Sequence, residues 1–133
     1  MSSTDLIIEY STNPSHKGII DNANIRYRES NRICADVVEV WLYIINGKLE
    51  QFSFDGYMSI VATACTAITG ELLEWREIQE ILTLNEAFIH ENIGNDISPR
   101  RRYASLIGLL AIKNAIHEWQ KDWIKEDFSD ITL

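Results

Sequence analysis

The sequence is short of cysteine, of basic side chains and of long apolar runs, and each shortage excludes a class of protein. Among 133 residues there are only two cysteines, Cys34 and Cys65. Two cysteines are too few for a disulfide framework or for a four-cysteine zinc site. Twelve lysine and arginine residues stand against 20 aspartate and glutamate residues, which gives a net charge of −8. A field of that sign repels phosphate backbones, so general nucleic-acid binding is disfavoured.

The longest apolar stretches run about nine residues, well short of the ~18–20 that cross a bilayer. The chain opens on polar residues, and Asp5 and Glu9 bracket the first apolar residues. This pattern is unlike a secretory leader, so we expect no membrane association and a cytoplasmic location.

The length is that of one domain, because single cores commonly run ~100–150 residues. The composition, 46% hydrophobic and 24% charged, is that of an ordinary globular protein. We therefore expect a single domain over residues 1–133, with residues 125–133 as a peripheral tail.

The first half of the chain is predicted to be rich in β-structure. Residues 6–10 form a short apolar run, and residues 23–28 alternate between apolar and polar side chains. Residues 37–45 are dense in β-branched and aromatic types, which favour strands. Asn46-Gly47 follows at once, before residues 48–54, and this dipeptide between two apolar runs predicts a tight hairpin.

The second half is predicted to be helical. Residues 60–72 carry apolar side chains at helical spacing on most sides, residues 74–82 form a more charged helical stretch, and residues 83–93 hold a short helix. Ser98-Pro99 is a typical helix start, and one long helix follows it. The apolar residues that support this helix are Leu106, Leu109, Leu110, Ala111, Ile116, Trp119 and Trp123. The fold class is therefore α+β: a three-stranded antiparallel sheet in the N-terminal half, packed against helices of the C-terminal half.

The Cys34-Ala35-Asp36 triplet lies at the entry to the strongest predicted strand. On an extended chain, a thiol and a carboxylate two residues apart point to the same side, so both could reach one metal. The alternative is a small apolar cysteine at a strand edge, which is the commoner role of a free cysteine. Cys65 lies within an apolar helical run, and core packing is the expected role of its thiol.

The three histidines, His16, His90 and His117, share no spacing that indicates a ligand pair, and we expect surface or capping roles. A nucleophilic pair of Cys34 with His16 stays open, because such partners meet in space rather than in sequence. Residues 100–102 are three consecutive arginines in the first turn of a helix, where the helix dipole favours anions. They are either solvated or a docking patch for a partner.

Four motifs, in order, resemble the IscU/NifU family of iron–sulfur cluster assembly scaffold proteins. Asn13-Pro14 with Gly18 resembles an N-P-x-x-x-G turn near the start of these proteins, and residues 34–36 resemble their C-G-D motif. Residues 54–59, ahead of the apolar helix, are similar to the second cysteine motif of the family. Residues 98–116 resemble the P-P-x-K-x-H-C stretch and the helix behind it.

The resemblance implies three cysteine ligands and a nearby aspartate, which hold a nascent [2Fe–2S] cluster or a zinc ion. By position, the first ligand is Cys34 and the aspartate is Asp36, whereas Ser59 and Ala104 occupy the other two cysteine positions. A hydroxyl is a hard donor and a methyl group donates nothing, so neither Ser59 nor Ala104 is expected to bind. Cys65 aligns with a small non-ligand residue and does not compensate. No cofactor is therefore expected to bind stably, and Cys34 and Asp36 are the remaining ligand candidates.

These departures favour a divergent scaffold-like protein, not an enzyme, whose own cluster binding is impaired or lost. Pro99, Arg100, Arg101 and Arg102 would form its docking surface, because Arg101 matches a basic residue that contributes to chaperone recognition in the family. The resemblance implies a cysteine desulfurase, a chaperone or a scaffold-family protein as the partner, and it also allows a homo-oligomer. The alternative is a cofactor-free binding or regulatory protein on the same fold. A cysteine-dependent enzyme built on Cys34 ranks third, since no base or oxyanion donor is identified.

Overall fold

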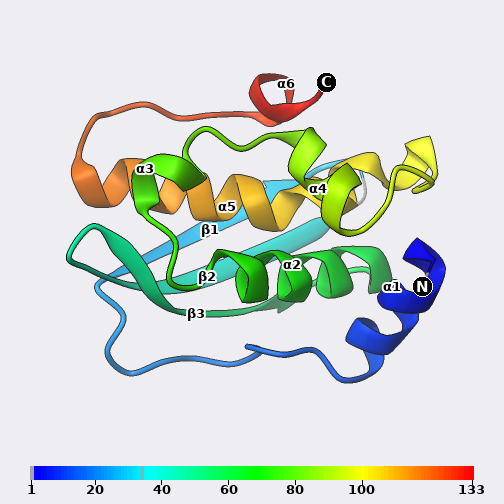
Figure 1. Cartoon of the computed structure of the whole chain (residues 1–133), viewed down its shortest axis with the longest axis horizontal. Coiled ribbons are helices and arrows are strands. Elements are labelled where there is room, and N and C mark those ends of the chain that lie inside the picture. The colour runs from blue at the N-terminus through cyan, green and yellow to red at the C-terminus, as the bar shows by residue number, and fades with distance from the viewer. Residues whose placement is uncertain (1, 34) are drawn as a thin grey trace.

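Helices cover one face of a three-stranded sheet, and the chain begins and ends with further helices (Figure 1). A computed structural model describes residues 2–33 and 35–133. Cys34 lies outside these described residues. The elements in chain order are α1 (Ser3–Thr12), β1 (Ile25–Asn31), β2 (Asp36–Ile45), β3 (Lys48–Tyr57), α2 (Ile60–Leu73), α3 (Ile78–Ile81), α4 (Glu86–Asn92), the 3₁₀ turn η1 (Pro99–Arg101), α5 (Arg102–Gln120) and α6 (Phe128–Ile131).

The sheet has the order β1-β2-β3, with both pairs antiparallel, which confirms the predicted sheet. The hairpin turn between β2 and β3 is also confirmed, because Asn46 and Gly47 both have positive φ, at 53° and 74°. Alternate side chains of β2 and β3 point towards the helices and are fully or almost fully buried. They are Val38, Val40, Leu42, Ile44, Phe52 and Phe54.

Helices α2 and α5 pack against each other and against the inner face of the sheet (Figure 1). Every residue of α5 from Ala104 to His117 is buried. The two helices come close because Gly108 of α5 faces Thr66 of α2, where a Cβ built on Gly108 would lie 2.9 Å from the Cα of Thr66. The predicted long helix is thus confirmed, but it ends at Gln120, and Trp123 lies beyond it. None of the helices in the described residues is long and apolar enough to cross a bilayer.

The chain starts with a helix, although its first half was expected to be rich in β-structure. The Ser2 side chain caps α1 by accepting a hydrogen bond from the backbone N–H of Asp5 at 3.2 Å. Leu6, Ile7 and Tyr10 then lie on the side of α1 that packs against the core. The steps of one residue from Leu6 to Ile7 and of three residues from Ile7 to Tyr10 are helical spacing. Ser2, three residues before the acidic Asp5, is a helix-start signal.

The charged stretch 74–82 is mostly not helical, because its first residues pair with the hairpin instead. The backbone N–H of Trp75 donates to Leu49 at 2.6 Å, and that of Leu49 donates to Arg76 at 3.0 Å. Trp75 has φ 71°, which ends any helical path. Only residues 78–81 form a turn of helix. The short helix expected within 83–93 is present as α4.

The last nine residues differ from the expected peripheral tail. Residues 128–131 form α6, which begins with a capping box of Asp127 and Asp130. Ile131 is fully buried in the core. The backbone of Leu133 is held by two side chains described below. The tail therefore returns to the body of the molecule through one apolar anchor and specific hydrogen bonds.

We expect Gly108→Ala to destabilise the protein, although alanine is the better helix former by about 1 kcal/mol. The added methyl would overlap Thr66, and overpacking of a filled interface costs roughly 1–3 kcal/mol. Denaturant unfolding measures the change, with the exposed Glu118→Ala on the same helix as the control, expected within about 0.5 kcal/mol of the parent. An unchanged or higher free energy of unfolding for Gly108→Ala would contradict the close packing of α2 on α5.

Candidate functional site

Asp36 is the first residue of β2, and its side chain ties this strand to the start of α2. The residue is 1% exposed, and its Oδ1 accepts a hydrogen bond from the backbone N–H of Ser59 at 2.7 Å. Its Oδ2 is also buried and has no hydrogen-bond partner among the described residues. A buried carboxylate oxygen without a partner is costly, which marks Asp36 as a residue retained for more than packing.

Ser59 is the N-cap of α2, where its Oγ accepts a hydrogen bond from the backbone N–H of Ala62 at 3.2 Å. The sheet register brings it close to Asp36, because Val37 at the start of β2 pairs with Tyr57 at the end of β3. The closeness of Ser59, at the second family cysteine position, to Asp36 therefore follows from the sheet register and the start of α2. The Ser59 hydroxyl has a structural role as a helix cap.

Ala104 lies in the first turn of α5 and is buried. Together with Ile33, Ser59, Arg100 and Arg101, it lines a cavity of about 420 Å³. The structure thus brings Ser59 and Ala104 to the same cavity, beside two of the arginines. Asp36 adjoins this cavity through its hydrogen bond from the Ser59 amide. Three motifs far apart in sequence converge here. Cys34, the remaining predicted ligand, lies outside the described residues.

The side chains at this convergence do not match the donor set of an iron–sulfur cluster. Clusters are held by thiolates, which are soft donors. Ser59 offers a hydroxyl that already caps a helix, Ala104 offers a methyl group, and one oxygen of Asp36 is engaged by a backbone amide. Among residues 2–33 and 35–133, no group of three histidine, cysteine, aspartate or glutamate side chains could hold a metal ion.

Cys65 does not supply the missing thiolate. The residue is 1% exposed inside α2, and burial raises the pKa of its thiol to about 12. A buried thiol in apolar surroundings stays protonated and inert. The predicted role in core packing is confirmed.

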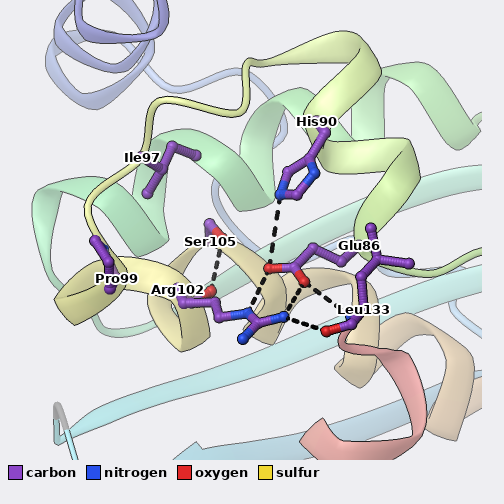
Figure 2. Close-up of a pocket in the computed structure, with 7 residues that line it drawn as sticks. All are labelled: Glu86, His90, Ile97, Pro99, Arg102, Ser105 and Leu133. Carbon is purple, nitrogen blue, oxygen red and sulfur yellow. Dashed lines mark hydrogen bonds and ion pairs between the residues drawn. The ribbon is translucent and has the colours of Figure 1, made fainter.

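Arg102, one of the predicted docking residues, is held in an ion pair. Its Nε donates to Oε2 of Glu86 at 2.7 Å, and its Nη2 donates to Oε1 at 2.5 Å (Figure 2). The Glu86 side chain is 5% exposed and that of Arg102 is 41% exposed. A two-point contact of this kind is among the strongest polar contacts in proteins. Arg102 therefore neutralises a buried carboxylate at the start of α5.

The same ion pair holds the last residue of the chain. The backbone N–H of Leu133 donates to Oε1 of Glu86 at 2.9 Å, and Nη2 of Arg102 donates to the carbonyl oxygen of Leu133 at 2.9 Å. His90 lies 3.7 Å from the same carboxylate, and the group borders a cavity of about 240 Å³ (Figure 2). Hydrogen bonds from Arg102 lower the pKa of Glu86 below its ordinary value, against the opposing effect of burial.

Arg100 and Arg101 are exposed and precede α5 in the η1 turn. Pro99 stands at the first position of that turn, which confirms the predicted helix start. Ser98 precedes it but makes no side-chain capping bond. Two of the four predicted docking residues, Arg100 and Arg101, thus line the same cavity as Ser59 and Ala104.

Two of the histidines have partners that the sequence did not reveal. Nε2 of His16 lies 2.6 Å from Glu74, so His16 is engaged at the far end of α2 from Ser59. His117 is 6% exposed, which contradicts its expected surface role, and it lies between Asp122 and Glu126. The sequence held a signal for the burial of His117. Because α5 carries apolar residues on all sides, its few polar side chains must also lie in the interior of the protein.

We expect Arg102→Ala to lower the free energy of unfolding near neutral pH more than Arg101→Ala does, because the Glu86 carboxylate loses its partner. Since the pKa of Glu86 is lowered in the folded protein, this stabilisation is complete above the ordinary pKa of 4.5. It is lost as the pH falls through the folded value. The difference between parent and variant should therefore shrink in acid. Arg101→Ala is the matched control, and equal losses for both variants would contradict the ion pair.

Sequence comparisons with known proteins identify the family of this chain. The profile of the family described as NifU-like N terminal domain matches residues 2–126. The chain is 20% identical over 116 residues to iron–sulfur cluster assembly scaffold protein IscU 1 of Archaeoglobus fulgidus, covering 87% of this chain and 75% of that protein. It is 22% identical over 86 residues to the IscU scaffold protein of Thermotoga maritima, covering 65% of this chain and 61% of that protein.

Solved structures with the same fold include the N-terminal part of a NifU-like protein from Brucella abortus. It has a TM-score of 0.73 at 14% identity, covering 91% of this chain and 99% of that one. A second is a SufU protein from Fervidobacterium islandicum described as a putative cluster assembly scaffold. It has a TM-score of 0.72 at 20% identity, covering 84% of this chain and 94% of that one. Because the family profile matches residues 2–126, this chain belongs to the NifU-like N terminal domain family. Iron–sulfur cluster assembly scaffold proteins of the IscU type are among its relatives.

Proposed function

We propose that this protein works in iron–sulfur cluster assembly as a scaffold-like docking protein whose own cluster binding is impaired or lost. The observation that carries the proposal is the lining of the cavity where the three motifs meet. Among the described residues that line it, Ser59 and Ala104 occupy two of the three family cysteine positions without a thiol, beside Arg100 and Arg101. The role is non-enzymatic, since no base or oxyanion donor is assigned at this cavity.

The donor count supports the loss of cluster binding. By family resemblance, Cys34 is the one thiol at a ligand position, and Asp36 is the one carboxylate. One soft and one hard donor fall short of the four that a tetrahedral iron or zinc ion takes. Asp36 is also constrained, because its Oδ1 holds the start of α2 through the Ser59 amide. A cluster would be cargo for such a protein, and this site has lost most of its ligands.

The docking role rests on the segment Pro99–Arg101 rather than on all three arginines. Arg100 and Arg101 are exposed and line the cavity, and Arg102 follows them in its ion pair with Glu86. In a chain of net charge −8, this basic segment would attract acidic patches that the rest of the surface repels. The partners that the resemblance implies are a cysteine desulfurase, a chaperone or a scaffold-family protein.

A second candidate is a purely regulatory protein that docks such a partner and accepts no sulfur or iron. The two candidates differ in the fate of Cys34. Transfer of persulfide sulfur from a cysteine desulfurase to Cys34 would support a retained assembly role. Absence of label on Cys34, with labelled desulfurase present, would support the regulatory role.

We expect the protein to remain colourless after anaerobic reconstitution with iron and sulfide, because two of three thiolates are missing. The double variant Ser59→Cys with Ala104→Cys should gain visible absorption and bound iron, since it restores thiolates at the family positions. Metal analysis and absorption spectra measure both. The control pair Lys48→Cys with Glu118→Cys adds exposed thiols at the opposite ends of the sheet and of α5 from the cavity, and it should gain no stable cluster.

A brown parent protein with about two irons per chain would contradict the loss of cluster binding. If neither the parent nor the double variant binds a cluster, the parent still lacks cluster binding. The residues at positions 59 and 104 would then not be enough to explain why it is lacking.

We also expect Arg101→Ala to weaken binding to a purified cysteine desulfurase or chaperone at least about fivefold, which is about 1 kcal/mol. The loss should shrink at high salt, because exposed charges are screened. Isothermal titration measures it, with Lys48→Ala at the far end of the sheet as the control. Unchanged affinity for Arg101→Ala would remove the Pro99–Arg101 segment from the docking surface.

A further inference from the structure

The segment after α5, residues 121–126, exposes two large apolar side chains on a strained backbone; we call it the Trp123 loop. Trp123 is 87% exposed and Ile124 is 56% exposed. Lys121 and Trp123 have φ of 54° and 63°, the left-handed region that side chains other than glycine rarely occupy. Such a residue persists only where its surroundings determine its conformation.

Buried polar groups of α5 hold both ends of the Trp123 loop. Nδ1 of His117 lies 2.7 Å from Oδ2 of Asp122, and Nε2 lies 2.7 Å from Oε2 of Glu126. Both ring nitrogens of His117 are therefore engaged by carboxylates of the loop, one at each end. The Asp122 Oδ1 accepts a further hydrogen bond from the backbone N–H of Ile124 at 2.9 Å.

Two more buried side chains hold Glu126. Nζ of Lys113 lies 2.8 Å from its Oε1. Asn114 accepts a hydrogen bond from its backbone N–H at 2.8 Å and donates one to its carbonyl oxygen at 2.9 Å. Lys113 and Asn114 are at most 3% exposed. The loop is thus a rigid support that presents Trp123 and Ile124 to solvent.

Beside this loop lies a groove of about 650 Å³, a volume within the range of ordinary ligand pockets. Its apolar lining comes from Trp123 and Ile124 on one side and from Ile25 and Tyr27 of β1 on the other. In the described residues β1 is an edge strand, with β2 as its one strand neighbour. The groove lies at the opposite end of β1 and β2 from Asp36, since Ile25 pairs with Leu42 and Asn31 with Asp36.

The charge at the groove is opposite to that of the whole chain. Among the residues that line it, two lysines, Lys121 and Lys125, stand against one glutamate, Glu118. The Asp122 and Glu126 carboxylates are turned away to His117 and Lys113. An apolar groove with a basic rim, in a chain of net charge −8, complements an apolar side chain flanked by carboxylates.

We propose that this groove binds a short acidic segment of a partner protein, with an aliphatic or aromatic side chain seated between Trp123 and Tyr27. Exposed tryptophans on preorganised supports are typical binding anchors, because little ordering entropy is lost on association. The observations favour this occupant over a second copy of the chain. In a two-fold dimer each patch would meet itself, so lysines would face lysines in two chains of the same net charge.

The test is a selection of random octapeptides displayed on phage against the immobilised full chain, with Trp123→Ala as the counter-target. The expected winners combine an apolar residue with aspartate or glutamate. Synthetic winners should bind Trp123→Ala at least about tenfold more weakly than the parent. The control Trp75→Ala removes another exposed tryptophan, 66% exposed, and should bind as the parent does.

A second set of variants tests the charge of the groove. The double variant Lys121→Glu with Lys125→Glu should also reduce binding at least about tenfold. Lys17→Glu, beside β3 at the edge of the sheet away from β1, should leave binding unchanged. Amide NMR spectra of each variant verify that it is folded. Three outcomes would overturn the proposal: winners that bind Trp123→Ala equally well, winners rich in lysine and arginine, or no enrichment at all. Sedimentation showing a dimer of the parent that Trp123→Ala abolishes would overturn it in favour of a second copy.

Discussion

The burial of α5 from Ala104 to His117 is the constraint on which the rest of this structure depends. Its residues Ala104 to His117 are enclosed by α2, by β1 and β2 of the sheet, and by the segments that follow α3 and α5. An apolar helix can be surrounded in this way without cost, but Lys113, Asn114 and His117 must then find partners inside. They find them in the Leu84 carbonyl and in the 122–126 segment. The course of the chain after α5 is therefore fixed by three polar side chains.

The N-terminal end of the same helix forms one wall of the candidate site. It places Ala104 beside the Ser59 cap of α2, and it places Arg100 and Arg101 at the rim. Ser59, Arg100 and Arg101 lie outside the apolar core, whereas Ala104 is part of it. The fold that this chain shares with scaffold relatives at about 20% identity is therefore compatible with serine at position 59 and alanine at position 104.

Local chemistry made much of the fold predictable from sequence. The Asn46-Gly47 turn, the alternation along β2 and the helical spacing of α2 depend on residues close together in the chain. The convergence at the site was predicted differently, from motifs that resemble a known family. The structure supports that placement through the contact between Asp36 and Ser59.

Contacts between distant residues were not predictable in the same way. Glu86 and Arg102 are each one of many charged residues in the sequence, and nothing local indicates that they pair across 16 positions and then hold Leu133. The clamp of His117 on the Trp123 loop was missed for the same reason. The helical start at Ser2 did have a local signal, but the short apolar run behind it resembled a strand.

The central claim is that this chain keeps the scaffold fold without a functioning cluster site. Native mass spectrometry of the protein, isolated without oxygen from iron-replete cells, tests it most directly. The account predicts the mass of the bare polypeptide, with Cys34 free or carrying persulfide sulfur. A mass that includes two irons and two sulfides, retained through purification, would contradict it.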